Sequence, residues 1–381
     1  MNDYVNTPPA IGITRQPRGL LMAGDNILDF EKITLVHSGT HEAGTMEAVV
    51  ASSPGGNPGQ WNWWLSQDVI VLDVYAGFPV DPRKYSSQDL TPLAKIRVDQ
   101  IDLDVAENRM VIQGRDLSAI FIDNKTDGQF QNQTSSQVAQ KFADGAGLKS
   151  KIQATTTKIG TYYSQDYVHV ERDQTQWALL VYLAQKEGFD IYVLGDTLYF
   201  GKFANANQSS YLIQFDSANS DRPYHQSNAK SLKFEHNLTL SRDVIVTVRS
   251  HNMKTGKSFS VVAKASHGKA QAARSLTPIT PTSAADAQNY VYVFHNLAPN
   301  DARQKALQLA KEISKHELVI AAELPGDDVL YPWVPIEISG TGTPFDTTFY
   351  ASRIERTISP ADFSISVSAK NHQTGTEVAL D

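Results

Sequence analysis

The sequence contains two stretches with the same order of predicted strands, loops and turns. Each stretch has a strand, a loop, a second strand and then a hairpin. These segments are Gly44–Ser52, Val69–Ala76 and Leu93–Gly114 in the first stretch, and Glu317–Glu323, Val334–Ser339 and Phe349–Lys370 in the second. Identity between the two hairpins is slight, and any two antiparallel β domains can be aligned this loosely. We favour a duplicated β-barrel, which restricts the chain to folds that contain the same sheet twice.

The first hairpin carries a local irregularity. Ile96 and Val98 alternate with polar residues, as in a half-buried strand. The next apolar residue is Ile101, so the step from Val98 to Ile101 breaks the alternation. We interpret this step as a β-bulge, because an extra residue in one strand moves the following side chains to the opposite face.

A compact unit of one helix and one hairpin is predicted between Thr175 and Lys202. Four residues have the spacing of a single helix face, namely Trp177, Leu180, Val181 and Ala184. Gly188 stands where a left-handed cap ends a helix, because glycine has no Cβ to clash there. Gly195 and Asp196 then supply a two-residue hairpin turn. The unit carries no reactive group, so it indicates a part of an assembly rather than an enzyme.

Two further helices are predicted. The first covers Gln137–Ala146, with Ser135 or Ser136 as its N-terminal cap and Gly147 at its end. The second begins near Asn300 and has one apolar stripe, formed by Ala302, Ala306, Leu309, Ala310 and Ile313.

Length and composition limit the class of protein. At 381 residues the chain exceeds the size at which a single core stops growing, so we expect more than one domain. The net charge is −7 and no long Lys/Arg run is present, which argues against sequence-specific binding to duplex DNA. Cysteine is absent, so disulfides and thiolate metal sites are excluded. No apolar run approaches 18 residues and the N-terminus lacks a secretory pattern, so neither a spanning helix nor a signal peptide is expected.

The chain resembles the baseplate hub proteins of contractile phage tails, also called late control D or tail-tube-like hub proteins. It is similar as well to the N-terminal part of type VI secretion spike proteins. The resemblance covers most of the chain and is carried by Gly114–Lys125, Val138–Lys149, Trp177–Phe200, Asp301–His316, Leu324–Gly340 and Tyr350–Lys370. One departure is Trp333, which stands after Pro332 where the family usually has glycine. This changes a turn and leaves the expected fold in place.

The resemblance implies a mainly β fold with some α (α+β), made of two tail-tube-like antiparallel β-barrels and a small α/β domain. We assign residues 1–125 to the first barrel, 126–215 to the small domain and 216–381 to the second barrel. The second barrel would include a mobile loop at 265–289 and a helix at 300–316. No cofactor and no small-molecule substrate is expected.

The resemblance also implies a homotrimer that joins the hexameric tail tube to a trimeric central spike. Two similar barrels in each of three chains give six similar steps around a ring, as closed symmetry requires. The expected partners are the tail tube protein, a separate spike protein and other baseplate proteins. DNA would pass through an acidic bore without specific binding. The location would be the virion tail baseplate, after assembly in the host cytoplasm.

Three other functions stay open on the sequence. The first is the hub part of a type VI or bacteriocin-like injector. The second is a tail-tip peptidoglycan-degrading enzyme. The third is a carbohydrate-binding module, in which Trp61, Trp63 and Trp64 would stack on sugars beside a Gly/Pro-rich loop. For these tryptophans we favour contact with another subunit, or a cover over the open end of the first barrel.

We weigh three groups of residues as catalytic or metal sites and commit to none of them. Histidines His37 and His41 lie beside Glu42, but Gly and Thr around them favour a turn over a helical zinc site. Paired carboxylates can hydrolyse glycosides, and two pairs qualify, Asp102 with Asp104 and Asp327 with Asp328. The first of these pairs alternates with apolar residues, as the solvent side of a strand does. Gly340–Gly342 is interpreted as a turn, and nucleophile-elbow, zincin and P-loop motifs are absent from the sequence.

Overall fold

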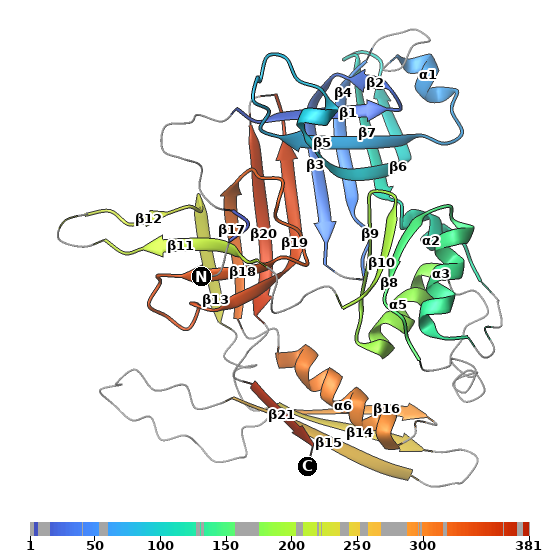
Figure 1. Cartoon of the computed structure of the whole chain (residues 1–381), viewed down its shortest axis with the longest axis vertical. Coiled ribbons are helices and arrows are strands. Elements are labelled where there is room, and N and C mark those ends of the chain that lie inside the picture. The colour runs from blue at the N-terminus through green and yellow to red at the C-terminus, as the bar shows by residue number, and fades with distance from the viewer. Residues whose placement is uncertain are drawn as a thin grey trace.

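The chain is mainly β with several helices, as predicted (Figure 1). The fold is that of a computed structural model, which describes residues 4–6, 16–39, 41–52, 60–126, 130, 133–156, 175–202, 209–218, 221, 223–236, 244–251, 258–267, 288–295, 297, 299–314, 318–360, 362–371 and 376–380. A 14-stranded sheet dominates this part of the chain, beside a 3-stranded and a 4-stranded sheet.

The first half of the large sheet is antiparallel throughout. In order across the sheet its strands are β2 (Asn26–Leu28), β1 (Arg18–Ala23), β5 (Val71–Gly77), β6 (Thr91–Asp104), β7 (Arg109–Asp116), β4 (Thr45–Ala51) and β3 (Phe30–Ser38). Alternate residues of these strands are buried, for example Leu21, Ile33, Leu72 and Ile96, because one face of the sheet packs on an apolar core. The short helices α1 (Trp61–Leu65) and η1 (Ser87–Asp89) lie in the connections on either side of β5.

The second half of the large sheet has its own core. Its strands, again in order across the sheet, are β13 (Ser231–His236), β17 (Leu318–Pro325), β20 (Phe363–Asn371), β19 (Thr348–Ile358), β18 (Pro335–Ser339), β11 (Tyr211–Asp216) and β12 (Gln226–Ser227). All neighbours are antiparallel except β11 and β18, which run parallel.

The two halves share one strand order. The path β3–β4–β7–β6–β5 in the first half corresponds to β13–β17–β20–β19–β18 in the second. The bulge is also repeated, between Val98 and Gln100 in β6 and between Ala351 and Arg353 in β19. The predicted duplication is therefore confirmed at the level of strand order, and the predicted bulge is confirmed as well.

The two expected barrels are not closed among the described residues. Instead of turning back on its own half, β3 pairs antiparallel with β19, from Ser38 opposite Arg353 to Ile33 opposite Ile358. This pairing makes a single continuous sheet of both halves (Figure 1). An edge strand that is used to join two halves cannot also close one of them, which is the physical reason for the difference.

The small α/β unit follows the first half and has a separate core. Its elements are the helices α2 (Ala119–Asp123), α3 (Ser135–Gly145) and α5 (Gln176–Glu187) and the strands β8 (Lys149–Ile152), β9 (Asp190–Leu194) and β10 (Thr197–Gly201). Thr175 caps α5, and Gly188 ends it in the left-handed region at φ +65°, as predicted. The cap of α3 differs from the prediction: it is Thr134, which forms a reciprocal capping box with Gln137, and not Ser135 or Ser136.

A fourth core lies between a second sheet and a long helix. The sheet has the order β16 (Gln288–His295), β14 (Val244–His251), β15 (Ser258–His267) and β21 (Thr376–Leu380), and the helix is α6 (Pro299–Ser314). Ala302, Ala306 and Ala310 of α6 are fully buried, because small residues let the helix lie close to the sheet. The predicted loop at 265–289 falls mainly between β15 and β16, and its residues 268–287 lie outside the described part.

Candidate assembly interface

The junction of the two halves contains a buried cation. Arg356 of β19 is 0% exposed and lies opposite Leu35 of β3. Its Nη1 is 3.0 Å from Nδ1 of His37, its Nε donates to the carbonyl oxygen of Asp327 at 3.4 Å, and its Nη2 donates to the carbonyl oxygen of Leu330. Burial lowers the pKa of this guanidinium, yet arginine starts high enough to stay charged. A desolvated charge needs such partners to be tolerated.

His37 is neutral at this junction. Burial, and then the charge of Arg356, lower the pKa of His37 to about 3. Its Nε2 is 3.2 Å from the carbonyl oxygen of Leu93, so the proton belongs on Nε2 and Nδ1 accepts from Arg356. The imidazole also meets the ring of Tyr331 edge-on, with ring centroids 5.4 Å apart. His37 therefore connects the two halves, and both of its ring nitrogens have partners at this junction.

A column of four stacked aromatic rings joins the small α/β unit to the second half. Their order is Tyr199, Tyr192, Trp333 and Tyr331, with successive ring centroids 4.7, 4.2 and 4.8 Å apart and planes within 13°. A cation lies over each end of the column at 5.0 Å, Lys151 above Tyr199 and Arg356 above Tyr331. Tyr192 is 7% exposed, so the column is a packed contact and not an open platform for sugars. Trp333, where the resembled family has glycine, thus supplies a ring to this contact.

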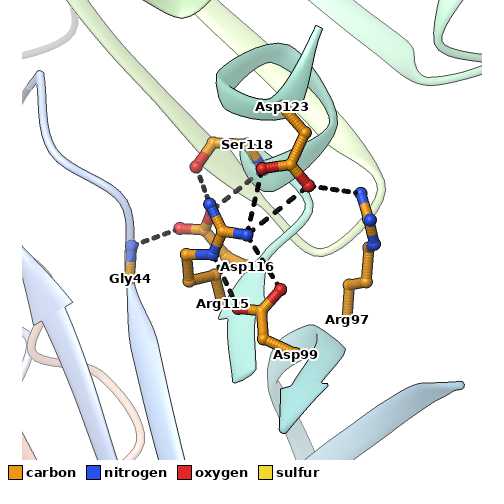
Figure 2. Close-up of polar contacts among 7 residues, drawn as sticks. All are labelled: Gly44, Arg97, Asp99, Arg115, Asp116, Ser118 and Asp123. Atoms are coloured by element: carbon orange, nitrogen blue, oxygen red, sulfur yellow. Dashed lines mark hydrogen bonds and ion pairs between the residues drawn. The ribbon is translucent and has the colours of Figure 1, made fainter. Parts of the chain in front are cut away.

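A buried carboxyl group closes one corner of the first half (Figure 2). Asp116, at the end of β7, accepts a hydrogen bond from the backbone N–H of Gly44 at 2.6 Å and another from that of Ser118 at 2.9 Å. The Ser118 hydroxyl donates to it as well. Burial raises the pKa of Asp116 to about 6, although these hydrogen bonds oppose the shift.

The second half has an amide in the same place. Asn371 ends β20 as Asp116 ends β7, and its side-chain oxygen accepts from the backbone N–H of Leu318, the first residue of β17, at 3.3 Å. Gly44 immediately precedes β4, the counterpart of β17. Both halves therefore satisfy the same backbone donor with a side-chain oxygen at the same point. Sequence reasoning missed this pair, although extending the comparison of the two hairpins by a few residues would have found it.

An exposed ion-pair group lies next to Asp116. Arg115 donates to Asp99 through Nε at 2.6 Å and through Nη2 at 2.8 Å, and its Nη2 also reaches Asp123 at 3.1 Å. Arg97 completes the group by contacting Asp123 at 3.0 Å (Figure 2). Asp99 is the bulged residue of β6, so the bulge places its carboxylate against Arg115. Arg115 in turn holds Asp123, the last residue of α2, against the sheet.

The other candidate residues have structural roles. The ring of His41 lies 3.3 Å from the carbonyl oxygen of Phe189 in the small unit, and its own carbonyl accepts from Trp177 Nε1 at 3.2 Å. Asp327 accepts from the backbone N–H groups of Val329 and Leu330 in a turn, and Asp328 accepts from the Thr91 hydroxyl. Among the described residues, His, Asp and Glu form no group of three that could hold a metal ion.

Asp102 and Asp104 are exposed on the outer face of β6, as predicted. Gly340–Gly342 forms the predicted turn, in which Asp346 accepts from the backbone N–H groups of Thr341 and Gly342.

The three tryptophans lie in the short helix α1 and not in the loop before it. Trp64 is 1% exposed and belongs to the core of the first half, and Trp63 meets it edge-on with centroids 5.1 Å apart. The indole N–H groups of Trp61 and Trp64 are buried without a hydrogen-bond partner among the described residues. This arrangement agrees with a cover over the first half.

Comparison with known proteins identifies the fold. No protein-family model matches the sequence, and no curated protein does either. Solved structures do match. A tail protein from Neisseria meningitidis MC58 aligns with a TM-score of 0.65 and 13% identity over 93% of this chain and 96% of that chain. The chain has the fold of a phage tail protein.

Two more structures share this tail-protein fold. The 43 kDa tail protein of prophage MuSo2 from Shewanella oneidensis aligns with a TM-score of 0.59 and 13% identity, over 95% of this chain and 98% of that one. The prophage tail protein gp18 from Listeria monocytogenes EGD-e aligns with a TM-score of 0.54 and 12% identity, over 93% and 94%. The resemblance to baseplate hub proteins is thus confirmed for the fold.

None of the described helices is long and apolar enough to cross a membrane.

Proposed function

We propose that the protein is a structural hub of a contractile phage tail, a homotrimer that joins the hexameric tail tube to the trimeric central spike. The observation that carries this proposal is the repeated strand path, β3–β4–β7–β6–β5 and β13–β17–β20–β19–β18. Three chains with two equivalent modules each present six similar surfaces on one side and threefold symmetry on the other. The protein acts through shape and symmetry, without catalysis or a cofactor, in the tail baseplate of the virion.

The exposed face of the continuous sheet carries charges of both signs, so the acidic bore rests on the net charge of −7 of the whole chain. Along the central strands β3, β4, β6, β7, β13, β17, β19 and β20, the strand registers place six carboxylates and at least seven basic side chains on this face. The acidic residues are Glu47, Asp102, Asp104, Glu235, Glu323 and Glu355, and the basic ones include Lys32, Arg97, Arg109, Arg115, Lys233, Arg353 and Lys370. A ring whose bore presents mainly the carboxylates would repel DNA phosphates, and the strand would pass without adhering.

Mass in solution and particle shape test the hub. We expect light scattering, over a concentration series up to the solubility limit, to approach three times the chain mass of 42.0 kDa. Electron microscopy should show rings with six similar lobes. A monomer at every concentration, with no rings, would contradict the proposal. Rings that retain duplex DNA at low salt would contradict the acidic bore, and substitution of Glu47 and Glu323 by Lys should create such retention.

The equivalent hub of a type VI or bacteriocin-like injector would use the same geometry, and the neighbouring genes distinguish it from a phage hub. A peptidoglycan-degrading enzyme is tested by a zymogram of the purified protein, in which we expect no clearing. The packing of Trp63 and Trp64 on the first core argues against a carbohydrate-binding module.

A further inference from the structure

Two strand edges of this chain correspond to the two edges that already pair inside it. From Gln100 to Asp104, β6 pairs on one side with β7, and no other described strand pairs with this segment. Likewise β17 is the one described strand that pairs with β13. The counterparts of β6 and β13 are β19 and β3, and these pair with each other at the junction of the halves. Backbone groups on an exposed edge are a template for another strand.

The junction inside the chain predicts the register of a junction between chains. Thr34 lies opposite Thr357 there, and Leu35 lies opposite Arg356. When the two halves are matched by their strand pairs and bulges, Thr34 and Leu35 of β3 correspond to Lys233 and Phe234 of β13. In the same match, Arg356 and Thr357 of β19 correspond to Leu103 and Asp104 of β6.

We propose that β6 of one copy pairs antiparallel with β13 of a second copy, with Asp104 opposite Lys233 and Leu103 opposite Phe234. This inference rests on the proposed trimeric hub and specifies how its ring closes. Each copy offers one edge of each kind, so the contact is head-to-tail and three copies use every edge.

Exposure of the inward-facing side chains supports this pairing. Leu35 and Ile358, on the paired edges inside the chain, are each 1% exposed. Their counterparts on the two open edges are Phe234, 37% exposed, and Val105, 57% exposed. Ile101 and Leu103 of β6 are also only half-buried against the first core. These apolar side chains are therefore partly exposed in the single chain, and pairing with a second copy buries them.

Charge on the outer face fits the same register. Asp104 and Lys233 have opposite signs and are both exposed. Asp104 uses Oδ1 for the backbone N–H groups of Ala106 and Glu107, which leaves its other oxygen for a lysine. In this register Asp102 would lie directly opposite Glu235, which is an unfavourable pair of like charges. Lys233, the diagonal neighbour of Asp102, would offset this repulsion. Pairing in this register is therefore expected to weaken when Lys233 is reversed in sign.

Cysteine cross-linking tests the register directly, because the natural chain has no cysteine. In the Asp104→Cys, Lys233→Cys double variant we expect mild oxidation to give disulfide-linked dimers and trimers on non-reducing gels. A mixture of the two single variants should give only a dimer linking the two different chains. Thr34→Cys with Thr357→Cys is the positive control, since it joins the equivalent pair within one chain and leaves its mass unchanged. Gln100→Cys with Lys233→Cys is the register control and should cross-link much less.

The outcomes separate this inference from the hub proposal. Trimers seen by light scattering, with cross-linking no higher for Asp104–Lys233 than for the register control, would overturn the proposed edge and leave the hub intact. Absence of both trimers and cross-links, with the intramolecular control linked, would overturn both. Reversing the charge with Lys233→Glu should weaken trimer formation, and adding Asp104→Lys on the same chain should restore it. A second variant that fails to restore trimers would contradict the ion pair.

Discussion

The two halves of the large sheet have the same strands in the same order, yet one corner is closed by Asp116 and the other by Asn371. Each side chain accepts a hydrogen bond from the backbone N–H group just before, or at the start of, the equivalent strand. Both corners have a side-chain acceptor, because a buried backbone N–H group without a partner destabilises either half. The acceptor group differs between the halves, because either an amide or a carboxyl oxygen can accept this hydrogen bond.

The environments of the two halves differ more than their strand paths. The first half is followed by the small α/β unit. In the second half, β14, β15, β16 and α6 are inserted between β13 and β17, and β21, which follows β20, completes their sheet. Likewise, Arg356 is buried at a position where β6 has the half-buried Leu103. Duplication therefore accounts for the sheets, and the contacts made outside the sheets account for the differences.

The largest expected effect concerns the unit that only the first half carries. Trp177 is 7% exposed, stacks on Phe121 with centroids 6.3 Å apart, and donates to the carbonyl oxygen of His41. Trp177→Ala should lower the free energy of unfolding by about 3–5 kcal/mol, since it leaves a large cavity. Chemical denaturation measures this, with exposed Tyr182→Ala of the same helix as a control of small effect. Equal losses in the two variants would show that α5 does not pack through Trp177.

Replacing the buried cation by the residue of the other half tests the junction. Arg356→Leu leaves His37 Nδ1 and the carbonyl oxygens of Asp327 and Leu330 without their donor. We expect a loss of about 2–4 kcal/mol in the free energy of unfolding. The cost of leaving these buried acceptors unpaired should exceed the desolvation cost that is avoided by removing the charge. Leu103→Met, the control at the equivalent position, should change stability by less than about 1.5 kcal/mol. A more stable Arg356→Leu protein would mean that the arginine is kept for a purpose other than stability.

Exchanging the corner residue of the second half should introduce the electrostatics of the first. Asn371 is 1% exposed, and Asn371→Asp places a carboxylate there at neutral pH. We expect a loss of about 1–3 kcal/mol near neutral pH, since a buried charge loses its hydration. The loss should shrink as the pH falls toward the ordinary pKa of aspartate, because the buried group takes up its proton before the unfolded chain does. A loss that is independent of pH would indicate a steric cause.

The reverse exchange isolates the titration of Asp116. Because burial raises its folded-state pKa from 3.8 to about 6, its protonated form stabilises the fold. This contribution is complete below the unfolded pKa of 3.8 and is lost as the pH rises to about 6. Relative to the natural protein, Asp116→Asn should therefore gain on the order of 1–3 kcal/mol between acidic and neutral pH. His37 titrates in both proteins and cancels in the difference, so parallel stability curves would contradict the shifted pKa.

Local features were set by the sequence alone. The helix cap at Gly188, the turn at Gly195, the bulge after Val98 and the repeated order of strands all depend on neighbours within a few residues. Backbone sterics and the alternation of apolar residues act over that range, so they can be predicted from one sequence. The cap of α3 was missed by one or two positions because Thr134, Ser135 and Ser136 can all cap a helix.

Only the tertiary structure decided how the repeated parts meet. The pairing of β3 with β19, the burial of Arg356 against His37 and the column from Tyr199 to Tyr331 join residues far apart in sequence. Periodicity shows that a strand has an apolar face, but it does not specify which other edge will satisfy its backbone. That choice depends on the combined burial, hydrogen bonding and charge of segments that meet only after folding.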